Sequence, residues 1–170
     1  MEKIGLFYGS DTGCTEAVAR LIRDLIGLDK VDVYDVYDIK GDEPKNYNKL
    51  ILGLSTWHDG QLQSSWDDYY SKFHDLDFTN KTVALFGLGD QYGYSTYFCD
   101  GIGVIGKQAE KNGATIIGNW STEGYEHDDS KALITDDTFI GLCLDEDNQE
   151  EQTDQRIHAW VKQIVEEFGI

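Results

Sequence analysis

Positive charge is scarce in this chain. Its 170 residues include 14 Lys and Arg against 32 Asp and Glu, which gives a formal net charge of -18 at pH 7. This balance argues against nucleic acid and anionic membranes as partners, because their phosphates would be repelled. It favours a protein partner with a basic face, which the field of the chain would attract.

Cysteines and long apolar runs are also few. The 3 cysteines are odd in number, widely spaced and without a CxxC pair, so they predict free thiols in a reducing compartment rather than a disulfide or zinc framework. The first residues lack the pattern of a signal peptide, and no apolar run approaches the roughly 18 residues of a membrane span. We therefore expect a soluble, cytoplasmic protein.

Short apolar runs alternate with amphipathic helical patterns along the whole chain. There is 1 proline, and the sequence contains no repeat and no linker, which predicts one domain over residues 1–170. The near-continuous apolar runs expected to form buried strands lie at 4–8, 50–54, 83–86 and 115–117, and a less uniform run at 31–36 indicates a strand nearer an edge. Helical spacing of apolar residues occurs at 18–25, 66–73, 102–109 and 157–164.

Alternation of strand and helix predicts an α/β fold. We expect a three-layer sandwich with a five-stranded parallel sheet in the order 2-1-3-4-5, which binds ligands at the carboxyl ends of its strands. Residues 118–137 show little periodicity, and a second apolar run follows at 139–144. We interpret this segment as an insertion of about 20 residues that interrupts the last strand.

The segment GSDTGCTE, residues 9–16, joins the first predicted strand to the first predicted helix. Backbone N–H groups and the helix dipole converge there, and Gly9 and Gly13 allow close approach of the backbone. Hydroxyl donors are supplied by Ser10, Thr12 and Thr15. Such a loop binds a phosphate without a cation, although the same residue types also form ordinary helix N-caps.

Five other patterns do not support a site. No Lys stands where a nucleotide-hydrolysing loop needs one. Cys14 and Arg20 fit the C-x5-R spacing of phosphatases, but the residues between them favour a helix rather than a loop around an anion. The GxGxxG match at 101–106 lies within a helical pattern and indicates close packing against the sheet. Residues 145–149 resemble part of a calcium loop, but we interpret them as a solvated acidic turn, and the four histidines lack metal-ligand spacing.

Two further loops leave the third and fourth predicted strands, at 55–60 and 87–95. Each contains at least one glycine and one aromatic residue of interest, Trp57 and Tyr94 respectively. The fold places both loops at the same sheet edge as the phosphate loop. Together they suit a flat, phosphorylated heterocycle held between aromatic rings, unless the two aromatics are ordinary loop residues.

The loops SDTGCT, STWHDG and GLGDQYGY, with the insertion and the run FIGLCLDEDNQ, together resemble flavodoxins of the long-chain type. The resemblance implies a low-potential one-electron carrier rather than an enzyme. It would hold FMN non-covalently, cycle it between semiquinone and hydroquinone, and act in place of ferredoxin.

The resemblance also implies a set of FMN-binding residues and no metal. The phosphate would be held by Ser10, Asp11 (through its N–H), Thr12, Gly13, Cys14 and Thr15. The ring would lie between Trp57 and Tyr94. Further contacts would come from Thr56, His58, Gly60, Gly89 and Asp90, with Tyr97, Cys99 and Asp147 at the margin.

The implied partners are redox proteins with basic faces. They comprise an NAD(P)H-flavodoxin reductase as donor and acceptor oxidoreductases such as nitrogenase or pyruvate oxidoreductase, with the carrier itself a monomer. An FMN-dependent NAD(P)H or quinone reductase of the same fold is the main alternative, and a partner-binding module without flavin is another. A signalling receiver domain is excluded because its acidic residues are replaced by Gly-Ser and Ser-Thr-Trp.

Overall fold

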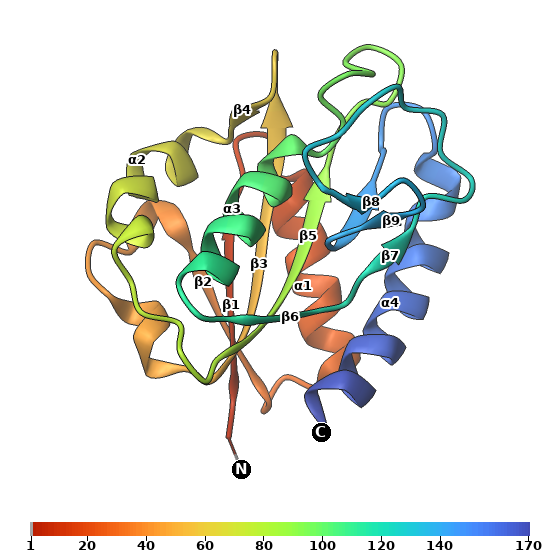
Figure 1. The fold of residues 1–170 in the computed structure, drawn as a ribbon. Coiled ribbons are helices and arrows are strands. Elements are labelled where there is room, and N and C mark those ends of the chain that lie inside the picture. Colours follow the sequence, from red (N-terminus) through yellow and green to blue (C-terminus); the bar gives the residue numbers. More distant parts are fainter. Residues whose placement is uncertain (1) are drawn as a thin grey trace.

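A parallel sheet of five strand positions forms the centre of the computed structural model, which describes residues 2–170 (Figure 1). The strands are β1 (Ile4–Gly9), β2 (Val31–Asp35), β3 (Lys49–Trp57) and β5 (Thr82–Leu88), with β6 (Thr115–Ile117) and β10 (Leu142–Leu144) in the fifth position. Hydrogen bonding gives the order β2–β1–β3–β5, and both β6 and β10 pair with β5. The predicted order of five strands is confirmed.

The fifth position is shared because each short strand pairs with one half of β5. Strand β6 lies opposite Thr82–Ala84, and β10 lies opposite Phe86–Leu88. Between them, residues 118–141 leave the sheet and form three short antiparallel strands of their own, β7 (Trp120–Ser121), β8 (Leu133–Thr135) and β9 (Thr138–Phe139). The predicted insertion is confirmed, but it extends to residue 141, so the apolar run at 139–144 is divided between the two sheets.

Two helix layers cover the sheet, as Figure 1 shows. The helices α1 (Cys14–Ile26) and α4 (Thr153–Phe168) pack on one face, and α2 (Ser64–His74) and α3 (Asp100–Lys111) on the other. Alternate residues of β1 enter opposite layers, with Leu6 beside α1 and α4 and Phe7 beside α2 and α3. None of the helices in residues 2–170 is long and apolar enough to cross a membrane.

Each layer has a fully buried tryptophan on a helix. Trp66 of α2 donates its indole N–H to the carbonyl of Gly53 at 3.0 Å, and Trp160 of α4 donates to the carbonyl of Gly118 at 2.8 Å. Full burial of a smaller apolar side chain such as Leu or Phe already contributes about 1.5–3 kcal/mol. Most of the apolar residues that recur at helical spacing in the sequence are likewise residues whose side chains pack in the core.

Short elements connect these layers. They are the 3-10 helices η1 (Val36–Asp38), η2 (Glu43–Asn46) and η3 (Glu150–Gln152), and the strand β4 (Gln61–Leu62), which forms a hairpin with the end of β3. Strand β2 forms one edge of the sheet, where its residues from Asp32 to Asp35 are partly exposed. The carboxylate of Asp32 accepts hydrogen bonds from Lys3 at 2.9 Å and Tyr47 at 2.8 Å.

The GxGxxG match lies inside α3, and its glycines serve packing. A Cβ at Gly103 would overlap the carbonyl of Lys131 in the insertion, and one at Gly106 would meet Ile140 at 2.7 Å. The N–H of Gly101 donates to the hydroxyl of Thr56 at 2.8 Å. The packing interpretation is confirmed, although Gly103 approaches the insertion, and Gly106 approaches both the insertion and Leu85 of β5.

Candidate functional site

Four chain segments meet in one cavity of about 280 Å³ at the carboxyl ends of β1, β3, β5 and β10. Three of these segments are the loops singled out in the sequence, and the fourth follows β10. The cavity is lined by Thr12, Cys14, Thr15, Ser55, Thr56, Trp57, His58, Leu88, Gly89, Asp90, Tyr94, Glu146 and Asp147. No Lys or Arg is among these residues, so any anion here is bound by neutral donors.

The first loop presents unused donors to this cavity. Within residues 2–170, the backbone N–H groups of Cys14, Thr15 and Glu16 have no acceptor, because they belong to the first turn of α1. Gly13 has φ of 92°, donates its N–H to the hydroxyl of Ser10 at 3.0 Å, and has open space where a side chain would stand. The loop thus forms a cradle whose donor set fits a phosphate group.

Gly9 has a different role from the one expected. A Cβ there would overlap the side chain of Gln63 and approach that of Trp66, so the glycine allows close packing inside the protein rather than approach of a ligand. Asp11 is exposed, and its carboxylate turns away from the cradle toward the start of α2. It accepts hydrogen bonds from the amide of Gln63 at 3.0 Å and the hydroxyl of Ser64 at 2.8 Å.

The second loop carries Trp57 at the end of β3. Its indole nitrogen is buried and has no hydrogen-bond partner among the described residues. His58 follows with φ of 48°, a conformation unusual for a residue other than glycine, and the hairpin then turns at Gly60, with φ of 87°. The turn therefore stores some backbone strain immediately beside the cavity.

The third loop is organised by the side chain of Asp90. Its Oδ1 accepts the N–H groups of Tyr92 at 3.1 Å and Gly93 at 2.7 Å, and the side-chain amide of Asn148 at 2.8 Å. Burial raises the pKa of Asp90, but the hydrogen bonds from Gly93, Asn148 and Tyr92 outweigh burial and leave the pKa below its usual value. The N–H of Tyr94 donates to the carbonyl of Asp90 at 3.0 Å, which fixes this aromatic at the cavity.

A buried carboxylate joins the third and fourth segments. Asp145 is 0% exposed, and its Oδ2 accepts the backbone N–H of Gln91 at 3.1 Å and the side-chain amide of Gln91 at 2.7 Å. Its Oδ1 accepts the N–H groups of Asp147 at 3.2 Å and Asn148 at 3.1 Å. The prediction of a solvated turn at 145–149 is therefore wrong for Asp145, whose charge is satisfied by N–H groups instead of water.

The fourth segment brings two further carboxylates to the cavity, those of Glu146 and Asp147. Burial raises the pKa of each above its usual value, and neighbouring acids add to the effect. Sequence reasoning included Asp147 but missed Glu146, as well as Ser55 and Leu88. Only their positions in the sequence could have indicated these residues, because Ser55 and Leu88 lie near the ends of strands at this edge and Glu146 follows such a strand.

The insertion braces the third loop from outside. The N–H of Glu126 donates to the side-chain carbonyl of Gln91 at 2.6 Å, and the N–H of Asp128 donates to the carbonyl of Ser95 at 2.8 Å. The hydroxyl of Ser130 also donates to the carbonyl of Phe98. The insertion and the loop that carries Tyr94 therefore form one hydrogen-bonded unit.

The remaining predicted residues lie around the cavity rather than in its lining; they are Ser10, Asp11, Gly13, Gly60, Tyr97 and Cys99. Gly60 packs against Tyr97, with 3.2 Å between a Cβ built at Gly60 and the Tyr97 ring. Cys99 is 0% exposed, and its thiol lies behind Gly89. Its side chain therefore faces the core and not the cavity.

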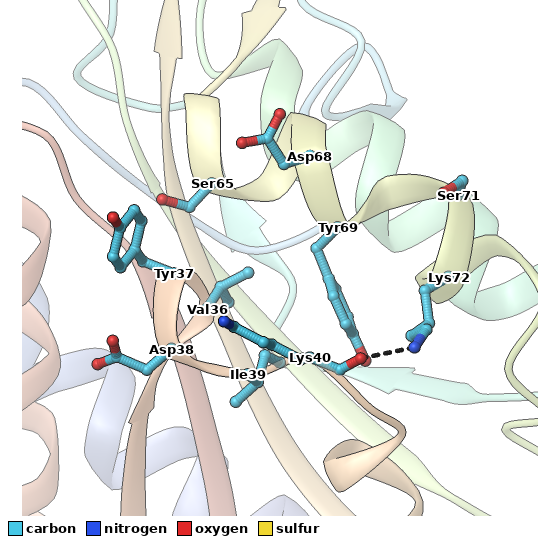
Figure 2. A pocket seen from close by; sticks show the side chains of 10 residues that line it. All are labelled: Val36, Tyr37, Asp38, Ile39, Lys40, Ser65, Asp68, Tyr69, Ser71 and Lys72. Atoms are coloured by element: carbon cyan, nitrogen blue, oxygen red, sulfur yellow. Dashed lines mark hydrogen bonds between the residues drawn. The ribbon is translucent and has the colours of Figure 1, made fainter.

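Larger hollows lie elsewhere, and two of them have volumes of about 620 Å³ each. The one in Figure 2 lies between the segment after β2 and α2, where the ammonium of Lys72 donates to the carbonyl of Lys40 at 2.6 Å. The other runs along β2 and is lined in part by Arg20 of α1. The guanidinium of Arg20 pairs with Glu16 at 2.8 Å, so Cys14 and Arg20 do not form the anion site of a phosphatase. Neither gathers the loops of several strands, so size alone does not identify the site.

The sequence and structure match known proteins over nearly their whole length. The model of the flavodoxin family matches residues 6–160. A flavodoxin of Haemophilus influenzae is 47% identical over 168 residues, 99% of this chain and 97% of that protein, and one of Nostoc sp. is 48% identical over 169 residues, 99% of each. The crystal structure of Fusobacterium nucleatum flavodoxin bound to flavin mononucleotide has a TM-score of 0.92 at 33% identity and covers 98% of this chain and 99% of that one. The chain therefore belongs to the flavodoxin family.

Proposed function

We propose that this chain is a low-potential one-electron carrier that holds FMN non-covalently and acts in place of ferredoxin. The observation that carries this conclusion is the convergence of four segments on one cavity, which combines a cradle for a phosphate with two aromatic side chains. The related flavodoxin of Fusobacterium nucleatum was crystallised with flavin mononucleotide. No substrate is converted, because the task of the protein is to carry electrons between other proteins.

The chain binds the two ends of FMN by different means. The first loop holds the phosphate through the free N–H groups at the start of α1 and through its hydroxyls, with Asp11 contributing only its N–H. Trp57 and Tyr94 enclose the ring and exclude water from it, and stacking of this kind is worth about 1–3 kcal/mol per face. When bound, FMN supplies the chemistry, which is uptake and release of single electrons at low potential.

The carboxylates at the cavity set this potential. Asp90, Glu146 and Asp147 line it, and no Lys or Arg does. Added negative charge on the ring is therefore disfavoured, which keeps the final electron easy to donate. Each 1.4 kcal/mol of this repulsion lowers a one-electron potential by about 59 mV.

The charge of the whole chain selects its partners. A net charge of -18 attracts proteins with basic faces and repels other copies of the chain. We therefore propose a monomer that receives electrons from an NAD(P)H-flavodoxin reductase and passes them to acceptor oxidoreductases of the nitrogenase or pyruvate oxidoreductase kind. The three free thiols, one of them exposed, support a reducing compartment, the cytoplasm.

Stepwise reduction with dithionite tests the proposal. The purified protein, loaded with FMN, should take up two electrons in two separate spectral stages. It should not oxidise NADPH with a quinone unless a reductase is added. Rapid oxidation of NADPH by the protein alone would instead make it a flavin-dependent reductase, and a colourless protein that ignores FMN would make it a binding module.

A further inference from the structure

Gln63 is a fully buried polar side chain next to the first loop, and it does not line the cavity. It precedes α2 and is 0% exposed. Its Oε1 accepts the N–H of Trp66 at 3.2 Å, and its Nε2 donates to the carboxylate of Asp11 at 3.0 Å and to the hydroxyl of Ser65 at 3.2 Å. The amide is thus satisfied at both ends.

The orientation of this amide is fixed by its surroundings. A backbone N–H can only donate, so the group facing Trp66 must be the carbonyl oxygen, and the NH2 group must face Asp11. A Cβ at Gly9 would overlap Gln63, so the side chain lies directly against the backbone that enters the phosphate loop. Strand β1, the first loop and the start of α2 are therefore joined through one side chain.

Asp11 presents an electrostatic problem that this contact solves. It lies within the loop that binds the phosphate, and although the residue is exposed, a carboxylate turned into the cradle would repel the phosphate at short distance. The carboxylate is instead held toward α2, by the amide of Gln63 and by the hydroxyl of Ser64 at 2.8 Å. It does not line the cavity.

We propose that Gln63 is a positioning residue for the phosphate of FMN, because it holds the Asp11 carboxylate away from the cradle. This inference rests on the proposed function. We therefore expect that loss of the Gln63 donor weakens binding of FMN, which carries the phosphate. Binding of riboflavin, the same flavin without the phosphate, should stay nearly unchanged. A residue with a purely structural role would affect both ligands alike.

The experiment measures dissociation constants of the apo-protein for FMN and for riboflavin by fluorescence titration. Gln63→Glu places a second carboxylate against Asp11 and should lower the preference for FMN over riboflavin by about tenfold or more. Gln61→Glu is the matched control, since it adds the same charge two residues away at an exposed position. Its preference should change by less than about threefold.

Exchange of the two partners provides the decisive variant. Gln63→Glu combined with Asp11→Asn restores one amide and one carboxylate across the same contact, and the preference for FMN should return to within about threefold of the wild-type value. If Gln63→Glu does not fold, Gln63→Met, alone and with Asp11→Asn, gives the same comparison. An equal loss of both flavins, or a preference that the exchange does not restore, would overturn the inference. Failure of the wild-type protein to bind FMN would overturn the proposed function instead.

Discussion

Asp145 is the residue whose replacement should cost the most stability for the smallest change in shape. In Asp145→Asn, one oxygen becomes an NH2 group of nearly the same size. Whichever way the new amide turns, it places NH2 against at least two N–H groups, either both donors of Gln91 or the backbone donors of Asp147 and Asn148. The side-chain amide of Asn148, which donates to both oxygens of Asp145, faces the new NH2 group in either case. Each buried donor without an acceptor costs about 1–3 kcal/mol.

We therefore expect a loss of about 2–4 kcal/mol from a total stability of about 5–15 kcal/mol. Urea unfolding of the apo-protein, followed by circular dichroism, measures it as a fall in midpoint of about 1–2 M at an unchanged slope near 2 kcal/mol/M. Asp136→Asn is the control, because that exposed carboxylate has no hydrogen-bond partner among the described residues. If the free energies of unfolding of the two variants differ by less than about 0.5 kcal/mol, the hydrogen bonds of Asp145 do not hold the third and fourth segments together.

Three further results are expected. Trp57→Ala should weaken FMN binding by about 1–3 kcal/mol, and an unchanged dissociation constant would contradict the enclosure of the ring. Gly103→Ala should lower the urea midpoint because its Cβ overlaps the Lys131 carbonyl, whereas Gly41→Ala, which meets only a flexible side chain, should not. Burial raises the pKa of Glu146 above 4.5, so its charge disappears as the pH falls through that raised value and the potential of bound FMN rises. The rise should be smaller in Glu146→Gln, measured by potentiometry between neutral pH and the lowest pH at which the protein stays folded.

The fold could be predicted because its strands are covered on both faces. Continuous apolar runs and helical spacing are direct consequences of that burial, and they predicted the strands in all five parallel positions of the main sheet and the four α-helices of residues 2–170, but not the short antiparallel strand β4. The small sheet of the insertion was not predicted. Its strands have only two or three residues, and β8 and β9 pair with an irregular register, so neither alternation nor length distinguishes them from a loop.

The site could be predicted only as far as its loops follow strands. Glycines and aromatics at three strand ends gave the cradle and the two rings, and the structure brings Thr12, Trp57 and Tyr94 to one cavity. The polar side chains that support the loops, such as Asp145 and Gln63, were missed. Whether a carboxylate is buried and hydrogen-bonded depends on donors that lie far from it along the chain. Asp145 lies 54 residues from Gln91 along the chain, and Asp11 lies 52 residues from Gln63.

Strand β2 also affects how separate copies of the protein behave toward one another. The edge of a sheet carries backbone groups ready to pair with a second chain, and an unprotected edge invites association into extended aggregates. Here the edge carries Asp32 and Asp35, partly exposed at the rim of the sheet. Asp32 is paired with the ammonium of Lys3, so the repulsion between two such edges at neutral pH comes from Asp35 and from the net charge of -18 on each chain. This repulsion fades in acid as the carboxylates become protonated. The excess of negative charge that suits the protein to basic redox partners thus also disfavours pairing between the sheet edges of two copies.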